Sequence, residues 1–328
     1  MIIERYKPFE FSTIIKSVPR EFLIHSEYRL FSTELLLSSY KQSLSESTEN
    51  KDIIIAAYEK EELCGYTQIN YSSFDSTIFG FEMYTIQCFV VYDNIKNNYD
   101  KIIQKLIDNV LDFAKERKIR HLSLSLNSNN ALSPKILTRL IQNKFYFINT
   151  LFTFSLVKDQ FSELDLNKYG SDDITVSKSR IEDTEQIMKI AQESFKLSRF
   201  HLDENLDNNK CDLLYLTSAK NSIQEGFADV VYVAKQNDKV LGYYSAKKRE
   251  NKILNCDFGI PIAAAVSKSA RKMGVFSMLN DFILKWYSSK ADISEVGTYI
   301  NNIPVHKTWT KNRLNIVRGS YQLAKYNS

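Results

Sequence analysis

The strongest constraint on the fold is an order of helices and strands that occurs twice along the chain. The stretch ELCGYTQIN in the first half matches KVLGYYSAK in the second, which pairs Gly65 with Gly242. From each glycine to the valine that ends the next apolar strand there are 26 residues (Val91) and 24 residues (Val266). Similar order and spacing in both halves predict one fold used twice.

Hydrophobic periodicity predicts the individual elements. In the first half these are a helix, three strands, a helix, a strand, a helix and a closing strand at 27–46, 52–59, 63–71, 83–91, 99–116, 121–127, 131–143 and 145–156. In the second half the helices are expected at 182–195, 210–224, 271–287 and 303–312, and the strands at 174–179, 229–235, 239–248, 257–266, 293–300 and 315–325.

The polar segment 158–173 separates the halves and places the predicted domains at 1–165 and 172–328. We expect an α/β (α+β) fold. Each domain should be a mixed, mainly antiparallel sheet with helices on both faces.

Composition narrows the class of protein. The formal net charge of +4 is too weak to predict nucleic-acid binding. Four cysteines lie far apart without a C-x-x-C, which argues against a zinc knuckle and a disulfide framework. The N-terminal sequence has no signal-peptide pattern, and no apolar run approaches the roughly 18 residues of a membrane span. We expect a cytoplasmic protein with neither nucleic-acid nor membrane partners.

Glycine is scarce, with 9 residues in 328, so each one is informative. The chain contains no G-x-G-x-x-G, no G-x-x-x-x-G-K-[ST] and no G-x-S-x-G, so the motifs of dinucleotide, P-loop and esterase sites are absent. One glycine opens a helix in SARKMGVFSML, residues 269–279, directly after the apolar run IPIAAAV.

That turn can bind an anion, because helix N-termini carry unpaired N–H groups and the positive end of the helix dipole. Gly274 has no Cβ to block a phosphate, and Arg271 and Lys272 add positive charge. The alternative is a glycine that only allows the strand and the helix to pack closely.

With this turn in its place, the order of elements resembles the GCN5-related N-acetyltransferase (GNAT) fold. That family has an Arg/Gln-x-x-Gly-x-Gly/Ala turn, and here Arg271-Lys272-Met273-Gly274-Val275-Phe276 fills the slot. Its Asn-x-x-Ala-x-x-x-Tyr pattern matches the stretch from Asn302 to Trp309. ESFKLSRFHLDE (193–204) and FDSTIFG (74–80) look like pieces of the dTDP-fucosamine acetyltransferase branch, which acetylates an amino group on a nucleotide sugar.

The resemblance implies acetyl-CoA as cosubstrate, a small-molecule amine as acceptor, and no metal. The implied coenzyme contacts are Ala264, Val266, Arg271, Lys272, Met273, Gly274, Val275, Phe276, Asn302 and Trp309. The first half has no glycine between Val91 and its next helix, so we expect a degenerate domain without a coenzyme site.

Two residues depart from the family pattern. Phe276 stands where the family has Gly or Ala, and its ring either enters the core or obstructs the phosphate path. Trp309 stands where many members keep a tyrosine that protonates the departing thiolate, and an indole N–H is no usable acid. Tyr299 on the preceding strand is a substitute; its alternative role is that of a half-buried strand aromatic.

The candidate bases for the amine are His201 and Asp257. His201, in a polar loop, is a base, a phosphate anchor together with Arg199, or a solvated loop histidine. Asp257 is a base or a strand-start cap.

Three functions follow: an N-acetyltransferase on an amino sugar or other small amine, a tandem aminoacyl transferase of cell-wall type, or a non-catalytic relative that binds coenzyme A or a partner.

Overall fold

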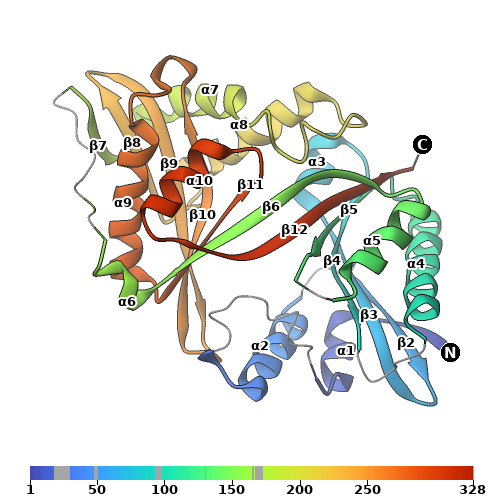
Figure 1. Ribbon diagram of the computed structural model, residues 1–328. Helices are drawn as coiled ribbons and strands as arrows, with labels where there is room; N and C mark the ends of the chain where they lie inside the picture. The colour runs from blue at the N-terminus through green and yellow to red at the C-terminus, as the bar shows by residue number, and fades with distance from the viewer. Residues whose placement is uncertain are drawn as a thin grey trace. The chain divides into compact units, whose positions relative to one another are not determined.

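The chain folds into two units, each described here by itself. The computed structural model describes residues 1–17, 30–47, 51–92, 98–129, 131–164, 166 and 173–327. Unit 1 comprises Met1–Phe152 and Arg318–Ser328, and unit 2 comprises Thr153–Val317 (Figure 1).

Unit 1 contains, in chain order, β1 (Ile2–Tyr6), α1 (Pro8–Ile14), α2 (Thr33–Ser45), β2 (Ile53–Glu59), β3 (Glu62–Tyr71), α3 (Ser73–Phe79), β4 (Met83–Val91), α4 (Tyr99–Glu116), β5 (His121–Asn127), α5 (Ser133–Gln142) and the start of β6 (Tyr146–Val157). The end of the chain adds β12 (Asn315–Tyr326). The sheet order is β1-β2-β3-β4-β5-β12. Only the β4–β5 pair among the described pairings of this unit is parallel.

Unit 2 contains the end of β6, then α6 (Lys158–Phe161), β7 (Thr175–Lys178), a 3₁₀ turn (Ile181–Asp183), α7 (Thr184–Ser194), α8 (Asn208–Gln224), β8 (Val230–Gln236), β9 (Lys239–Asn251), β10 (Cys256–Val266), a 3₁₀ turn (Lys268–Ala270), α9 (Val275–Lys290), β11 (Ile293–Tyr299) and α10 (Ile303–Lys311). The sheet order is β6-β11-β10-β9-β8-β7. Here β10 and β11 are parallel, and the pairings from β7 to β10 are antiparallel.

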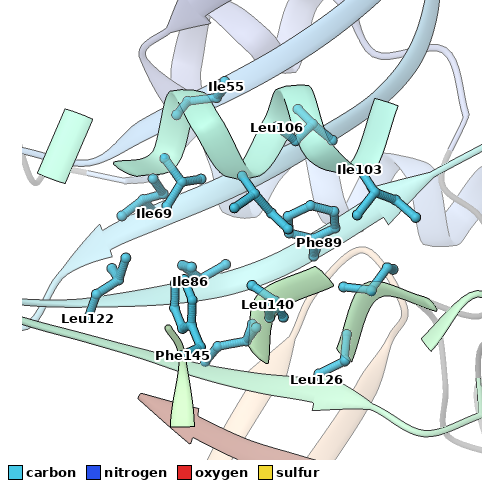
Figure 2. Close-up of a cluster of buried hydrophobic side chains, with 14 of the residues drawn as sticks. Ile55, Ile69, Ile86, Phe89, Ile103, Leu106, Leu122, Leu126, Leu140 and Phe145 are labelled. Atoms are coloured by element: carbon cyan, nitrogen blue, oxygen red, sulfur yellow. The ribbon is translucent and has the colours of Figure 1, made fainter. Parts of the chain in front are cut away.

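Helices cover both faces of the sheet in unit 1, because side chains alternate along its strands. Ile55, Ile86 and Phe89 face α4 and α5, where they join the cluster drawn in Figure 2. Ile54 and Val90, their neighbours in sequence, face α1 and α2 on the other side. In unit 2, Tyr243 packs with α7 and the adjacent Tyr244 stacks on Phe276 of α9. The predicted fold class is confirmed.

The predicted repeat extends to single irregularities. Gly65 pairs with Val91 and Gly242 with Val266. A Cβ on either glycine would lie within 2.8 Å of the carbonyl oxygen of Val90 or Ala265, so both copies require glycine. The register of β3–β4 shifts between Gln68 and Ile69, and the register of β10–β9 shifts between Pro261 and Ala263, which is the same place in the repeat.

The compact units differ from the predicted domains 1–165 and 172–328 at their closing strands. The chain leaves unit 1 within β6, and it returns to unit 1 within β12. Ser320–Tyr326 of β12 pair antiparallel with Asn127–His121 of β5. Adjacency along the sequence does not determine which strand completes a sheet, so periodicity could not reveal this pairing. The predicted boundary itself falls largely outside the described residues.

We predict that Leu323→Ala destabilises unit 1 selectively. Leu323 is 1% exposed in the core shared with α4 and α5. A truncation of this kind should lower the free energy of unfolding by about 2–5 kcal/mol. Hydrogen exchange resolved by segment should show faster opening of β4, β5 and α4. The control Leu213→Ala, at a position 46% exposed, should change little. Equal loosening of both units would contradict this assignment of β12.

Candidate active site

The sheet of unit 2 opens between two parallel strands. The parallel pairing of β10 with β11 covers only Phe258↔Ile293 and Gly259↔Ser294. Beyond Gly259, β10 continues along β9 as far as Val266. Continued in the same register, Tyr299 would lie opposite Ala264. The two strands therefore form the walls of an opening at their carboxyl ends, where ligands bind in α/β sheets.

Pro261 gives this opening a physical cause. The Asp292 N–H donates to the Asp257 carbonyl (2.8 Å), so by alternation the backbone groups of Gly259 and Pro261 also face β11. Proline has no N–H, and its place within a sheet is at an edge or a bulge. In unit 1 the equivalent residue is Ile86, and the parallel pairing there extends through Ile86↔Leu124.

The backbone of β10 presents N–H groups to the opening. The Ser267 N–H donates to the Leu241 carbonyl (2.8 Å), so Ser267 and Ala265 face β9. By alternation, the N–H groups of Ala264 and Val266 point away from β9 and into the opening. This geometry agrees with the role predicted for these two residues, which is to polarise a carbonyl group.

The helix that follows begins with an uncapped positive end. Gly274 is the N-cap of α9, makes no side-chain cap and has φ +78°, a left-handed conformation that disfavours other residues. The first hydrogen bond of the helix runs from Met278 N to Gly274 O (3.1 Å), so the preceding N–H groups lack partners within the helix. Its first turn contains no acidic residue, and Arg271 and Lys272 are exposed beside it.

Gly274 is required for its backbone angle rather than for space within the protein. A Cβ there would meet nothing within 4 Å. Lys272 also has a positive φ, +68°, which makes the turn unusually tight. Met273 is 44% exposed, whereas Val275 is buried and packs toward Gly242. Any side chain added at Gly274 would therefore project into open space beside the helix terminus.

Phe276 does not obstruct this terminus. Its ring stacks on Tyr244 of β9, with centroids 6.2 Å apart and planes 16° apart. Because Tyr244 is 1% exposed, the phenylalanine ring points to the sheet. The sequence left open whether the Phe276 ring enters the core or obstructs the phosphate path, and in the structure the ring points to the core.

Trp309 lies in the core of unit 2. It is 4% exposed, its Nε1–H donates to Asn280 Oδ1 (3.1 Å), and its ring packs edge-on against Phe154. The indole has one donor, and that donor is used. The predicted contact of Trp309 with a coenzyme is therefore not supported. Asn302 is the N-cap residue of α10 without a side-chain capping bond, and its Nδ2 donates to Thr298 Oγ1 (2.9 Å). Its contact with a coenzyme stays a prediction.

Asp257 is at the wrong end of its strand to act as a base. It lies seven residues before Ala264, roughly 23 Å away along an extended strand. Its carboxylate accepts a hydrogen bond from Lys248 Nζ (3.0 Å), and its N–H donates to Asp292. These contacts agree with a strand-start residue, and the catalytic role of Asp257 stays a prediction that its distance from Ala264 does not favour.

A loop between α7 and α8 reaches the β11 wall. The backbone N–H of Arg199 donates to the Tyr299 hydroxyl (3.0 Å). Burial raises the pKa of the Tyr299 phenol, so this group is protonated at neutral pH. The Arg199 guanidinium lies over the ring of Phe200, 4.7 Å from its centroid. The sequence predicted Tyr299 and Arg199 separately, and the structure brings them together.

His201 is a buried histidine with a hydrogen bond at each ring nitrogen, and it is not a solvated loop residue. Its side chain is 4% exposed, with Nε2 2.7 Å from Asp212 Oδ1 and Nδ1 3.0 Å from Ser198 Oγ. Both ring nitrogens are engaged with protein partners, and burial keeps the imidazole from an exposed substrate position. The predictions of a base and of a phosphate anchor at His201 are not supported by this geometry.

Sequence reasoning missed Asp212, Ser198 and Tyr215, the residues that surround His201. Lys196 also bonds the Asp212 carboxylate. Partial burial acts to raise the pKa of Asp212, but the hydrogen bonds from Lys196 and His201 outweigh that effect and lower it. The available signal was the i, i+3 spacing of Ser198 and His201, typical of a turn bonded to itself.

Comparisons with known proteins bear on the fold. No family model and no curated protein sequence matches the chain. A GCN5-related N-acetyltransferase from Sphaerobacter thermophilus is similar with TM-score 0.61 and 11% identity, over 99% of this chain and 95% of that one. A tandem GNAT protein from the clavulanic acid biosynthesis pathway gives TM-score 0.58 and 8% identity, over 99% and 98%. A GNAT-family acetyltransferase from Colwellia psychrerythraea gives 0.52 and 10%, over the whole of both chains.

The chain has a tandem GNAT fold. The fold-level resemblance seen in the sequence is therefore confirmed, and identities of this size show the fold alone. The likeness to nucleotide amino-sugar acetyltransferases stays a prediction.

The described residues show neither a metal cluster nor a membrane-spanning helix. No group of three or more His, Cys, Asp and Glu side chains there is arranged to hold a metal ion. No helix in that part of the chain is long and apolar enough to cross a membrane.

We predict that Asp212 stabilises the protein in a pH-dependent way. A carboxyl whose pKa is lowered on folding stabilises the native state above its unfolded pKa, about 3.9, and loses this effect as pH falls through the folded value. Urea unfolding should show wild type more stable than Asp212→Asn at pH 7. The difference should shrink below about pH 4. A difference that stays constant down to the acid limit would contradict the ion-paired state of Asp212.

Proposed function

We propose that unit 2 is an N-acetyltransferase that moves an acetyl group from acetyl-CoA to a primary amine. The observation that supports this most is the opening between β10 and β11, with the uncapped, basic terminus of α9 at the same carboxyl end of the strands. An elongated anionic thioester fits such a site, since its phosphates would meet N–H groups and cations.

The residues that would hold the coenzyme follow from the turn. The N–H groups of residues 274–277, with Arg271 and Lys272, would bind the diphosphate. Ala264 and Val266 would direct backbone N–H groups at the thioester carbonyl, which stabilises the charge that develops on its oxygen. Acetyl-CoA supplies the activated acetyl group.

The chemistry balances without a further reactant. The amine nitrogen forms a bond to the acetyl carbon, the carbon–sulfur bond breaks, and its electron pair goes to sulfur. The ammonium proton leaves to water and the thiolate takes one up. In this proposal Tyr299 would donate a hydrogen bond to the sulfur. Its raised pKa makes it a better hydrogen-bond donor than proton donor, because efficient acids have a pKa near the working pH.

Unit 1 is proposed to lack a coenzyme site. The first turn of α4, equivalent to that of α9, contains the acidic residue Asp100. A carboxylate there would repel a phosphate, and its ion pair with Arg139 (3.3 Å) offsets part of that effect. The stretch 93–97 before α4 lies outside the described residues, so the proposal for unit 1 depends on α4 itself.

The two alternative functions make different demands. A non-catalytic relative would bind acetyl-CoA without releasing thiol in the presence of any amine. An aminoacyl transferase would use charged tRNA and release no thiol from acetyl-CoA. Calorimetry with acetyl-CoA, followed by thiol release over a panel of amines, therefore separates the three.

We predict that Gly274→Leu weakens acetyl-CoA binding at least about tenfold, which corresponds to ~1.4 kcal/mol. The matched control is Gly226→Leu. Gly226 also has a positive φ, +67°, and also has no neighbour within 4 Å of a built Cβ. Both variants therefore carry similar backbone strain, and only one adds a side chain at the α9 terminus. Equal affinities of the two folded variants in calorimetry would refute the phosphate assignment.

We predict that Arg199→Ala weakens binding of an acceptor that carries phosphate. A charge-assisted hydrogen bond is worth about 1.5–3 kcal/mol, so KM for a nucleotide amino sugar should rise roughly ten- to a hundredfold. KM for the free amino sugar and the affinity for acetyl-CoA should not change. Arg199→Lys keeps the charge but loses the planar fork. Its KM for the nucleotide amino sugar should lie between those of wild type and Arg199→Ala. If Arg199→Ala changes neither KM, a small amine without phosphate becomes the preferred acceptor.

A further inference from the structure

The α7–α8 loop contains a buried polar cluster that the proposed chemistry does not use. The cluster consists of Ser198, His201 and Asp212, with the ring of Tyr215 stacked on the imidazole at 5.9 Å and 19°. Tyr215 also stacks on Phe195, with centroids 4.3 Å apart. A buried polar cluster is costly unless every member has its hydrogen-bond partner, so its purpose requires an explanation.

The order Ser–His–Asp invites comparison with a nucleophilic triad, but the placement argues against one. Ser198 is 4% exposed, and its Oγ also accepts the backbone N–H of His201 (3.2 Å). A nucleophile must reach its substrate, and this hydroxyl is enclosed by its own turn. The cluster is therefore a fixed structural link.

That link leads from helix α8 to the opening in the sheet. Asp212 on α8 holds His201 through Nε2, and His201 holds Ser198 through Nδ1. The next residue, Arg199, donates its N–H to the Tyr299 hydroxyl at the end of β11. Three short contacts of 2.7, 3.0 and 3.0 Å thus connect a rigid helix to the wall of the opening.

We propose that the His201–Asp212 pair is a positioning device that aims the Tyr299 hydroxyl proton into the opening between β10 and β11. The hydroxyl oxygen accepts the Arg199 N–H, so its own O–H points elsewhere. Tyr299 would lie opposite Ala264 in register, and the proton is then directed toward the reacting sulfur. The inference rests on the proposed acetyl transfer, and it makes His201 a positioning residue.

The first test measures position without requiring activity. Hydrogen exchange of the Arg199 amide should become about tenfold faster in Tyr299→Phe, which removes its acceptor. His201→Phe keeps an aromatic ring beside Tyr215 but removes both hydrogen bonds, and it should accelerate exchange similarly. Asp212→Asn can still accept from Nε2 and should restore most of the protection. His121→Phe, another buried histidine, serves as the control and should leave the Arg199 amide unchanged.

The second test is a double-mutant cycle on acetyl transfer. Tyr299→Phe and His201→Phe should each lower kcat by about tenfold and leave the KM for acetyl-CoA unchanged. In the Tyr299→Phe background, His201→Phe should then lower kcat by less than about twofold, because the two substitutions remove the same contribution. Multiplicative losses would show that His201 only stabilises the loop, and they would overturn the proposal.

The outcomes separate the two proposals. If no amine is acetylated, the proposed function fails, and the exchange measurement still decides the positioning claim. If exchange at Arg199 is unchanged in His201→Phe, the positioning claim fails whatever the activity. Should His201→Phe not fold, Ser198→Ala removes one hydroxyl from the same link and is judged by the same two criteria.

Discussion

The site depends on one lost interaction, the pairing between β10 and β11 beyond Gly259. A continuous parallel sheet would bury the N–H groups of Ala264 and Val266 in a ladder and leave no opening beside Tyr299. Pro261 prevents this, because it faces β11 without a donor. The basic terminus of α9, the exposed backbone of β10 and the hydroxyl on β11 are useful only because the strands separate.

The two units show how one scaffold can gain or lose such a site through few residues. Both keep the glycine that allows close approach of the next strand and the same bulge after it. Unit 1 has Ile86 where unit 2 has Pro261, so its parallel strands stay paired further. Unit 1 also has Asp100 in the helix turn where unit 2 has no acidic residue. The two units share their backbone geometry and differ in the side chains at the strand opening and at the helix terminus.

Local patterns predicted what local forces determine. The alternation in 239–248 and the helical spacing of 182–195 gave the elements, and the Gly65/Gly242 match gave the repeat. The turn at Gly274 was predictable because a helix terminus and a positive φ are local properties. The closing strand of unit 1 could not be predicted, because β12 pairs with β5 and roughly two hundred residues of chain separate them. No local pattern encodes a partner that distant.

The side chains of the site were harder to predict for a related reason. His201 sits in a polar loop sequence and yet is buried, because Asp212 on the next helix and the ring of Tyr215 enclose it. Trp309 matches a family position and yet packs against Phe154. In each case tertiary neighbours decide whether a polar or aromatic residue meets solvent, ligand or core.

The return of β12 to unit 1 has a consequence for biosynthesis. Tyr326 pairs with His121, so the core around Leu323 closes a loop of about two hundred residues, at an entropic cost that grows slowly with length. During translation, unit 2 has its whole sequence available before residues 318–326 of β12 are made, whereas unit 1 waits with the edge of β5 unpaired. The nascent chain therefore exposes the edge of β5 until β12 is synthesised, and a chaperone would find its binding surface there.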